Sequence, residues 1–195
     1  MSARIPVLAI AVVTFVLSVT LSLGAPLGDP ATSKADSRLC GVWEWQDPMT
    51  KRAIIRAWDE RTYIVDVLAG DLNADGATRP RERTVFKAWL TDIDGQTFLT
   101  LQPIESVGTV NGDERKPAYL IGRIKFDGQT MTVAAINMEF AKVKEATSAK
   151  ELEGVIKANL NDPALFTTPT TVTRWTPEQV KGLDKLQQIF REWKP

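Results

Sequence analysis

Histidine is absent from this chain of 195 residues, and cysteine occurs once. Without histidine the chain can form no Ser-His-Asp or Cys-His catalytic group and no His-ligated zinc, haem or non-haem iron site. A single cysteine cannot close an intramolecular disulfide, and it cannot supply the several thiolates of a zinc site or an iron–sulfur cluster. Lysine and arginine together number 24 and the carboxylates also number 24, so the basic excess of a nucleic-acid binder is missing.

The sequence also lacks the motifs of common enzyme classes: a G-x-S-x-G elbow, a Walker A loop and a G-x-G-x-x-G turn. Carboxylates such as Asp66, Asp92 and Asp94 could pair for acid–base chemistry, as in glycosidases. Nothing in their spacing separates them from ordinary solvated surface residues. The sequence therefore predicts a non-enzymatic protein with no catalytic residue, and a carboxylate hydrolase is the most distant alternative.

An export signal is predicted at the N-terminus. An uncharged apolar run, residues 5–23, follows Arg4 and ends at the small residues Gly24 and Ala25, which is the order of a secretory signal peptide. Ser22 and Gly24 favour cleavage after Gly24, so residues 1–24 are the expected signal. The same run could span a bilayer uncleaved and anchor the chain to the outer side of the membrane. Both versions predict a periplasmic or extracellular protein.

Residues 25–39 are rich in Pro, Ala, Ser, Asp and Gly without apolar periodicity, which predicts a flexible linker. Cys40 lies well beyond the apolar run, so we do not interpret it as a lipoprotein anchor. It is expected to be a small buried hydrophobe or, alternatively, an exposed thiol able to link two chains. Residues 40–195 are enough for one domain with a substantial core.

Short β-type segments fill most of that domain. Eight candidates are separated by turn residues: 41–45, 52–58, 62–68, 84–91, 96–101, 119–126, 129–136 and 171–175. Residues 85–93 also fit a helical period, but we predict a strand because the segment leads straight into the hairpin turn at residues 92–95. Seven of the eight follow one another as a meander. Because closure removes exposed sheet edges, we predict an antiparallel barrel of about eight strands.

Two helices are predicted late in the chain. Ser148 and Glu151 form a capping box, which predicts a helical insertion before the last strand. Thr176 and Pro177 begin a C-terminal helix, expected to pack outside the barrel through an apolar stripe. That stripe consists of Val180, Leu183, Leu186, Phe190 and Trp193. Its alternative reading is a helix that binds a partner.

Gly41-x-Trp43 on the first predicted strand and Arg174 on the last resemble the signature of lipocalins and the wider calycin superfamily. In that superfamily an arginine from the last strand packs across the tryptophan of the first. The resemblance would cover roughly residues 40–176 and implies a lipocalin-like barrel whose interior holds one small apolar ligand or lipid. It implies structural roles for Gly41, Trp43 and Arg174, and it assigns no ligand-contacting residue.

The loop after the third predicted strand matches the calcium-loop pattern D-x-[DN]-x-[DN]-G-x5-E. Its expected ligands are side-chain oxygens of Asp71, Asn73 and Asp75, the carbonyl oxygen of Ala77 and both carboxylate oxygens of Glu82. The sequence thus predicts a weak Ca²⁺ site. The alternative is an ordinary polar hairpin loop, in which Asn, Asp and Gly are common for turn reasons.

Two functions follow from these patterns. The first is an exported, non-enzymatic binding protein for a small apolar ligand or lipid, which contacts a membrane only through an uncleaved N-terminal segment. The second is a structural or protein-interaction module of the cell envelope whose barrel is filled by side chains. The barrel interior discriminates between them, because a carrier needs a continuous apolar cavity of some hundreds of Å³.

Overall fold

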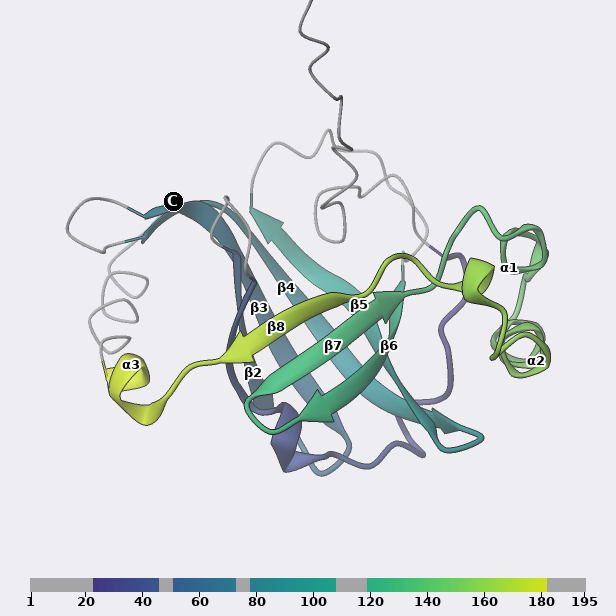
Figure 1. Cartoon of the computed structure of the whole chain (residues 1–195), viewed down its shortest axis with the longest axis horizontal. Helices are drawn as coiled ribbons and strands as arrows, with labels where there is room; N and C mark the ends of the chain where they lie inside the picture. Colours follow the sequence, from purple (N-terminus) through teal and green to yellow (C-terminus); the bar gives the residue numbers. More distant parts are fainter. Residues whose placement is uncertain (1–22, 46–50, 73–77, 108–118, 182–195) are drawn as a thin grey trace, which may run out of the picture.

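The computed structural model describes residues 23–45, 51–72, 78–107 and 119–181. Eight antiparallel strands form a closed barrel in meander order, in which each strand pairs with the next and the last pairs with the first (Figure 1). The strands are β1 (Gly41–Trp45), β2 (Lys51–Ala57), β3 (Thr62–Leu72), β4 (Thr78–Ile93), β5 (Gln96–Val107), β6 (Leu120–Asp127), β7 (Thr130–Ala135) and β8 (Thr170–Arg174). The predicted fold class is confirmed.

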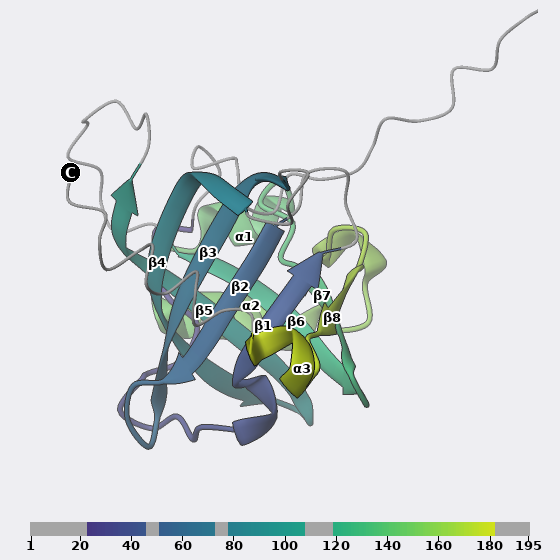
Figure 2. The same cartoon turned by 90° about the vertical axis from the view of Figure 1, so that its left-hand side faces the viewer.

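The helices are short and lie outside the barrel. They are the 3₁₀ turns η1 (Ser37–Leu39) and η2 (Pro163–Leu165) and the helices α1 (Ala141–Glu145), α2 (Ala149–Ala158) and α3 (Pro177–Lys181). Figure 1 shows α1 and α2 together beside one end of the barrel, while α3 lies at the other end; Figure 2 shows α3 nearest the viewer, with α1 and α2 behind the strands. The predicted insertion before the last strand and the predicted C-terminal helix are both present.

The β4–β5 hairpin shows whether residues 85–93, which also fitted a helical period, form a strand or a helix. Its two turn residues, Asp94 and Gly95, have φ angles of 50° and 77°, as a two-residue type I′ turn requires. The Asp92 carboxylate accepts a hydrogen bond from the Gly95 N–H at 3.0 Å and holds the turn. Residues 85–93 are therefore strand, as predicted, because local turn chemistry outweighs a helical spacing of apolar residues.

The barrel interior is built by alternation along each strand. On β3, for example, Tyr63, Val65 and Val67 point to the same side and are all buried. A second apolar cluster lies outside the wall, where Leu152 and Ile156 of α2 pack with Phe98 and other residues of the outer face. The β5–β6 wall therefore carries an apolar cluster on each side.

The structure does not support the predicted flexible linker at residues 25–39. Leu27 and Leu39 have exposed fractions of 0%. The Leu27 carbonyl accepts hydrogen bonds from the indole of Trp89 at 2.8 Å and from the hydroxyls of Thr91 and Thr100 at 3.2 and 3.1 Å. Average composition is polar here, but single leucines meet complementary positions on the wall. Composition cannot reveal such contacts.

The predicted export signal lies almost wholly outside the described residues. Leu23, the last residue of the apolar run, is buried and pairs with Tyr119 through two backbone hydrogen bonds of 3.1 Å. Among the residues that the structure describes, no helix is long and apolar enough to cross a bilayer. In α3, Val180 is exposed, and the remaining residues of its predicted stripe lie outside the described part.

Candidate functional site

The seam between β1 and β8 brings the three signature residues together. Trp43 and Arg174 are direct partners in the β1–β8 register, and the Arg174 guanidinium carbon lies 5.0 Å from the Trp43 ring centroid. The Trp43 indole donates to the Leu39 carbonyl at 2.8 Å, and Arg174 donates to the Cys40 carbonyl at 2.5 Å. These contacts hold η1 across one end of the barrel.

The contact between Arg174 and Trp43 requires a glycine at position 41. Its φ is 145°, and a Cβ atom there would lie 3.1 Å from Nε of Arg174. That nitrogen is buried and has no hydrogen-bond acceptor among the described residues, so the arginine is held mainly by ring stacking and by its NH2 group. Gly41, Trp43 and Arg174 therefore form a structural clamp.

Tyr63 supports η1 from the inside of the barrel. Its hydroxyl accepts a hydrogen bond from the Asp36 N–H and donates to the Asp36 carbonyl at 3.2 Å. Burial raises the pKa of Tyr63 to about 12. A hydrogen bond from Arg38 holds the pKa of the Asp36 carboxyl below its usual value. These pKa shifts arise from packing and one ion pair.

In the barrel interior, described residues with apolar side chains line a small cavity of about 40 Å³. Trp43 and Trp45 lie on one side of this cavity, as their alternation predicts, and Phe86 and Met131 also line it. A water molecule occupies about 30 Å³ in the liquid, whereas drug-sized ligands occupy cavities of about 300–1,000 Å³. The cavity is therefore several times smaller than a usual small-molecule site.

The predicted calcium loop falls mostly outside the described residues. Asn73, Asp75 and Ala77 lie there, as do the side chains of Asp71 and Glu82. The backbone of the last two belongs to β3 and β4, which pair antiparallel on either side of the loop. The loop therefore joins two strands. Within the described part of the chain, no three Cys, Asp or Glu side chains gather to hold a metal, and the calcium site stays a prediction.

The carboxylates considered for acid–base chemistry do not pair with one another. Asp66 contacts Arg56 at 2.9 Å and Arg83 at 2.6 Å on the outer wall. Asp94 contacts Lys157 at 3.1 Å, and Asp92 caps the β4–β5 turn. Each therefore has a structural partner.

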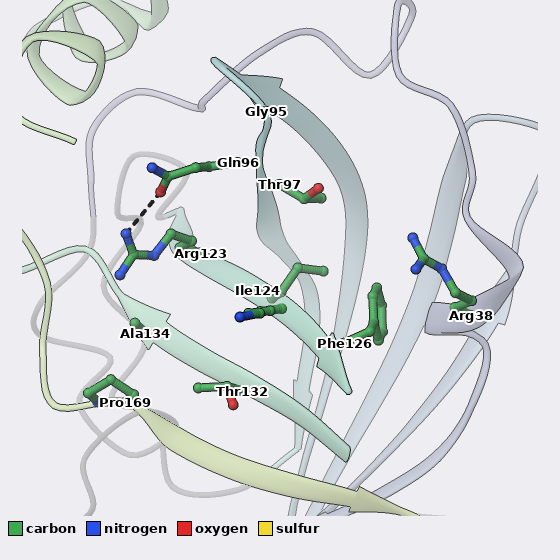
Figure 3. Close-up of a pocket in the computed structure, with 11 residues that line it drawn as sticks. Arg38, Gly95, Gln96, Thr97, Arg123, Ile124, Phe126, Thr132, Ala134 and Pro169 are labelled. Atoms are coloured by element: carbon green, nitrogen blue, oxygen red, sulfur yellow. Dashed lines mark hydrogen bonds between the residues drawn. The ribbon is translucent and has the colours of Figure 1, made fainter. Parts of the chain in front are cut away.

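A larger hollow, of about 490 Å³, lies where β5, β6 and β7 approach the segment before β8 (Figure 3). It shares no lining residue with the interior cavity. No motif in the sequence singles it out. Its one local signal is the pair Arg123 and Lys125, two cations at alternate positions of a strand.

Comparison of the chain with protein families, with curated proteins and with solved structures gives no match. We therefore argue the function of the protein from its own geometry.

Proposed function

We propose that this chain is an exported, non-enzymatic module of the cell envelope with a lipocalin-like barrel, in which the barrel is a filled scaffold and the outer surface makes contacts with protein partners. The observation that carries the proposal is the interior cavity of about 40 Å³. A site for a lipid would need several times that volume. The lipocalin-like assignment is supported by the strand order and by Arg174 lying over Trp43.

The outer surface supplies a candidate contact for a protein partner. Trp58, which directly follows β2, has an exposed fraction of 68%. Tryptophan is enriched among the residues that carry protein–protein binding energy. Absence of catalysis is part of the same proposal, and it is supported by the structural partners of Asp66, Asp92 and Asp94.

A carrier of a small apolar ligand is the second candidate. Its support is the chemistry of the cavity wall, which is apolar throughout. The flexible side chain of Met131 lines the cavity and could rotate to enlarge it.

Native mass spectrometry of the processed protein, purified from its own host without detergent, tests the choice. A filled scaffold predicts the mass of the chain alone in every preparation. A reproducible additional mass, removed by organic extraction and identified as an apolar molecule, would instead establish the carrier.

A further inference from the structure

The groove in Figure 3 forms because two strands part. The β5–β6 pairing ends at Thr97 and Ile124, and the groove of about 490 Å³ continues from there along β7 to Pro169. This volume falls within the range of about 300–1,000 Å³ that small-molecule sites occupy. Arg38, Arg123 and Lys125 line the groove, and none of its described lining residues is a carboxylate.

Arg123 is held in place by neutral groups. Its NH1 donates to the Gln96 side-chain oxygen at 2.9 Å, the bond drawn in Figure 3. Its guanidinium carbon lies 3.9 Å from the Phe166 ring centroid. These two contacts fix the planar group while its other N–H donors have no acceptor among the described residues. A guanidinium that is already fixed loses less conformational entropy when a ligand binds, so the entropic cost of binding is lower.

Among the described residues no carboxylate contacts Arg123, unlike other arginines on the wall. Arg52, Arg56 and Arg83 each contact a carboxylate at 2.6–2.9 Å. Arg123 instead contacts two neutral groups, the Gln96 side-chain oxygen and the Phe166 ring. Lys125 is exposed and has no ion-pair partner in the part of the chain that the structure describes. A concave surface with an excess of one charge concentrates ions of the opposite sign.

Arg38 contributes less charge to the groove. Its guanidinium contacts the Asp36 carboxylate at 2.6 Å and lies 4.9 Å from the Phe126 ring centroid. In Figure 3 it lies at the Phe126 end, away from Arg123. One end of the groove is therefore cationic, and the other offers an aromatic face with a neutralised cation.

We propose that this groove binds a small molecule that carries a tetrahedral oxyanion, a phosphate or a sulfate. Arg123 and Lys125 are two residues apart on β6, so their α carbons are separated by about 6–7 Å, close enough for one such group to contact both side chains. Thr132 lies opposite Lys125 in the β6–β7 register and supplies a hydroxyl. The site shares no residue with the interior cavity, so it does not depend on the proposed function.

The test is calorimetric titration of the full chain at low salt with two probes. They are inorganic phosphate, which represents the oxyanion alone, and soluble dihexanoyl phosphatidylglycerol, which represents an anionic lipid headgroup. We expect saturable binding of at least one probe, weakened by added salt. Binding of phosphate without the lipid would indicate a soluble phosphorylated ligand, and tighter binding of the lipid would indicate a headgroup.

Variants locate the site. Because the Lys125 side chain is exposed, the Lys125→Gln variant should fold normally. It should weaken binding about tenfold or more, the usual effect of losing one charge-assisted hydrogen bond. Arg123→Gln should have a similar effect, with folding checked by near-ultraviolet circular dichroism. Arg56→Gln removes the same charge from a different part of the wall and should leave the dissociation constant unchanged. The proposal is overturned if neither probe binds in the millimolar range, or if Arg56→Gln weakens binding as much as Lys125→Gln.

Discussion

At the scale of single residues, Gly41 couples backbone geometry to the closure of the barrel. Its φ of 145° is one that side-chain-bearing residues rarely adopt, and a Cβ would press on Arg174. We expect Gly41→Ala to lower the free energy of unfolding by about 1–3 kcal/mol, the usual cost of such backbone strain. Chemical denaturation followed by tryptophan fluorescence measures the loss.

Gly154 is the matched control for that substitution. It lies in the middle of α2, is exposed, and has nothing within 4 Å of the position of an added Cβ. Gly154→Ala should raise the free energy of unfolding by about 0.5–1 kcal/mol through helix propensity. Equal effects of the two substitutions would contradict the clamp.

The buried environment of Tyr63 can be tested at high pH. Its pKa is raised from 10.0 to about 12 by burial, so the neutral phenol is favoured in the folded state. Its contribution to stability is therefore fully present below pH 10 and is lost as pH rises toward 12. In an ultraviolet titration of tyrosinate, Tyr63→Phe should remove a component that titrates near pH 12. Ionisation of Tyr63 near pH 10 in the folded protein would contradict this environment.

At the scale of elements, the N-terminal segment behaves as part of the barrel wall. Leu27 is fully buried in the outer cluster, and three side chains donate to its carbonyl. Leu27→Ala should destabilise the protein by about 2–5 kcal/mol, as for other buried leucines. Ile104→Ala, on an exposed position of β5, should change stability by less than about 0.5 kcal/mol. A tolerated Leu27→Ala would show that the segment is loosely attached.

The β3–β4 hairpin carries the calcium prediction. Calorimetric titration of the wild-type chain should show Ca²⁺ binding with a dissociation constant of about 10⁻⁴ to 10⁻³ M. Asp71→Asn should abolish it, whereas Asp127→Asn, in the β6–β7 hairpin, should not. A flat titration of the wild type in the millimolar range would leave the ordinary hairpin loop as the explanation of the motif.

Elements were predictable where their chemistry is local. The Asp94-Gly95 turn fixes the hairpin register by its own backbone, and Ser148 starts α2 by accepting from the Glu151 N–H at 3.3 Å. Contacts between distant residues could not be predicted from pattern. Trp89 and Leu27 are 62 positions apart, and stacking of Arg123 on Phe166 depends on where the helical insertion returns to the sheet. The resemblance supplied the pairing of Arg174 with Trp43, which no local pattern contains.

At the scale of the whole molecule, the two hollows differ in chemistry. The interior cavity lined by described residues is apolar and measures about 40 Å³, while the groove is cationic and about 490 Å³ in volume. A filled interior makes the barrel a rigid support, because close-packed cores resist deformation. We therefore propose that binding takes place on the outside of the wall.

The most direct test of this account is titration of the processed protein with a long-chain fatty acid, followed by tryptophan fluorescence, since Trp43 and Trp45 line the cavity. Ala53→Leu, which would fill the same cavity, serves as the comparison. A filled scaffold predicts no saturable change in either protein. Saturable binding of one fatty acid per chain that Ala53→Leu weakens would place the ligand inside the barrel and contradict the account.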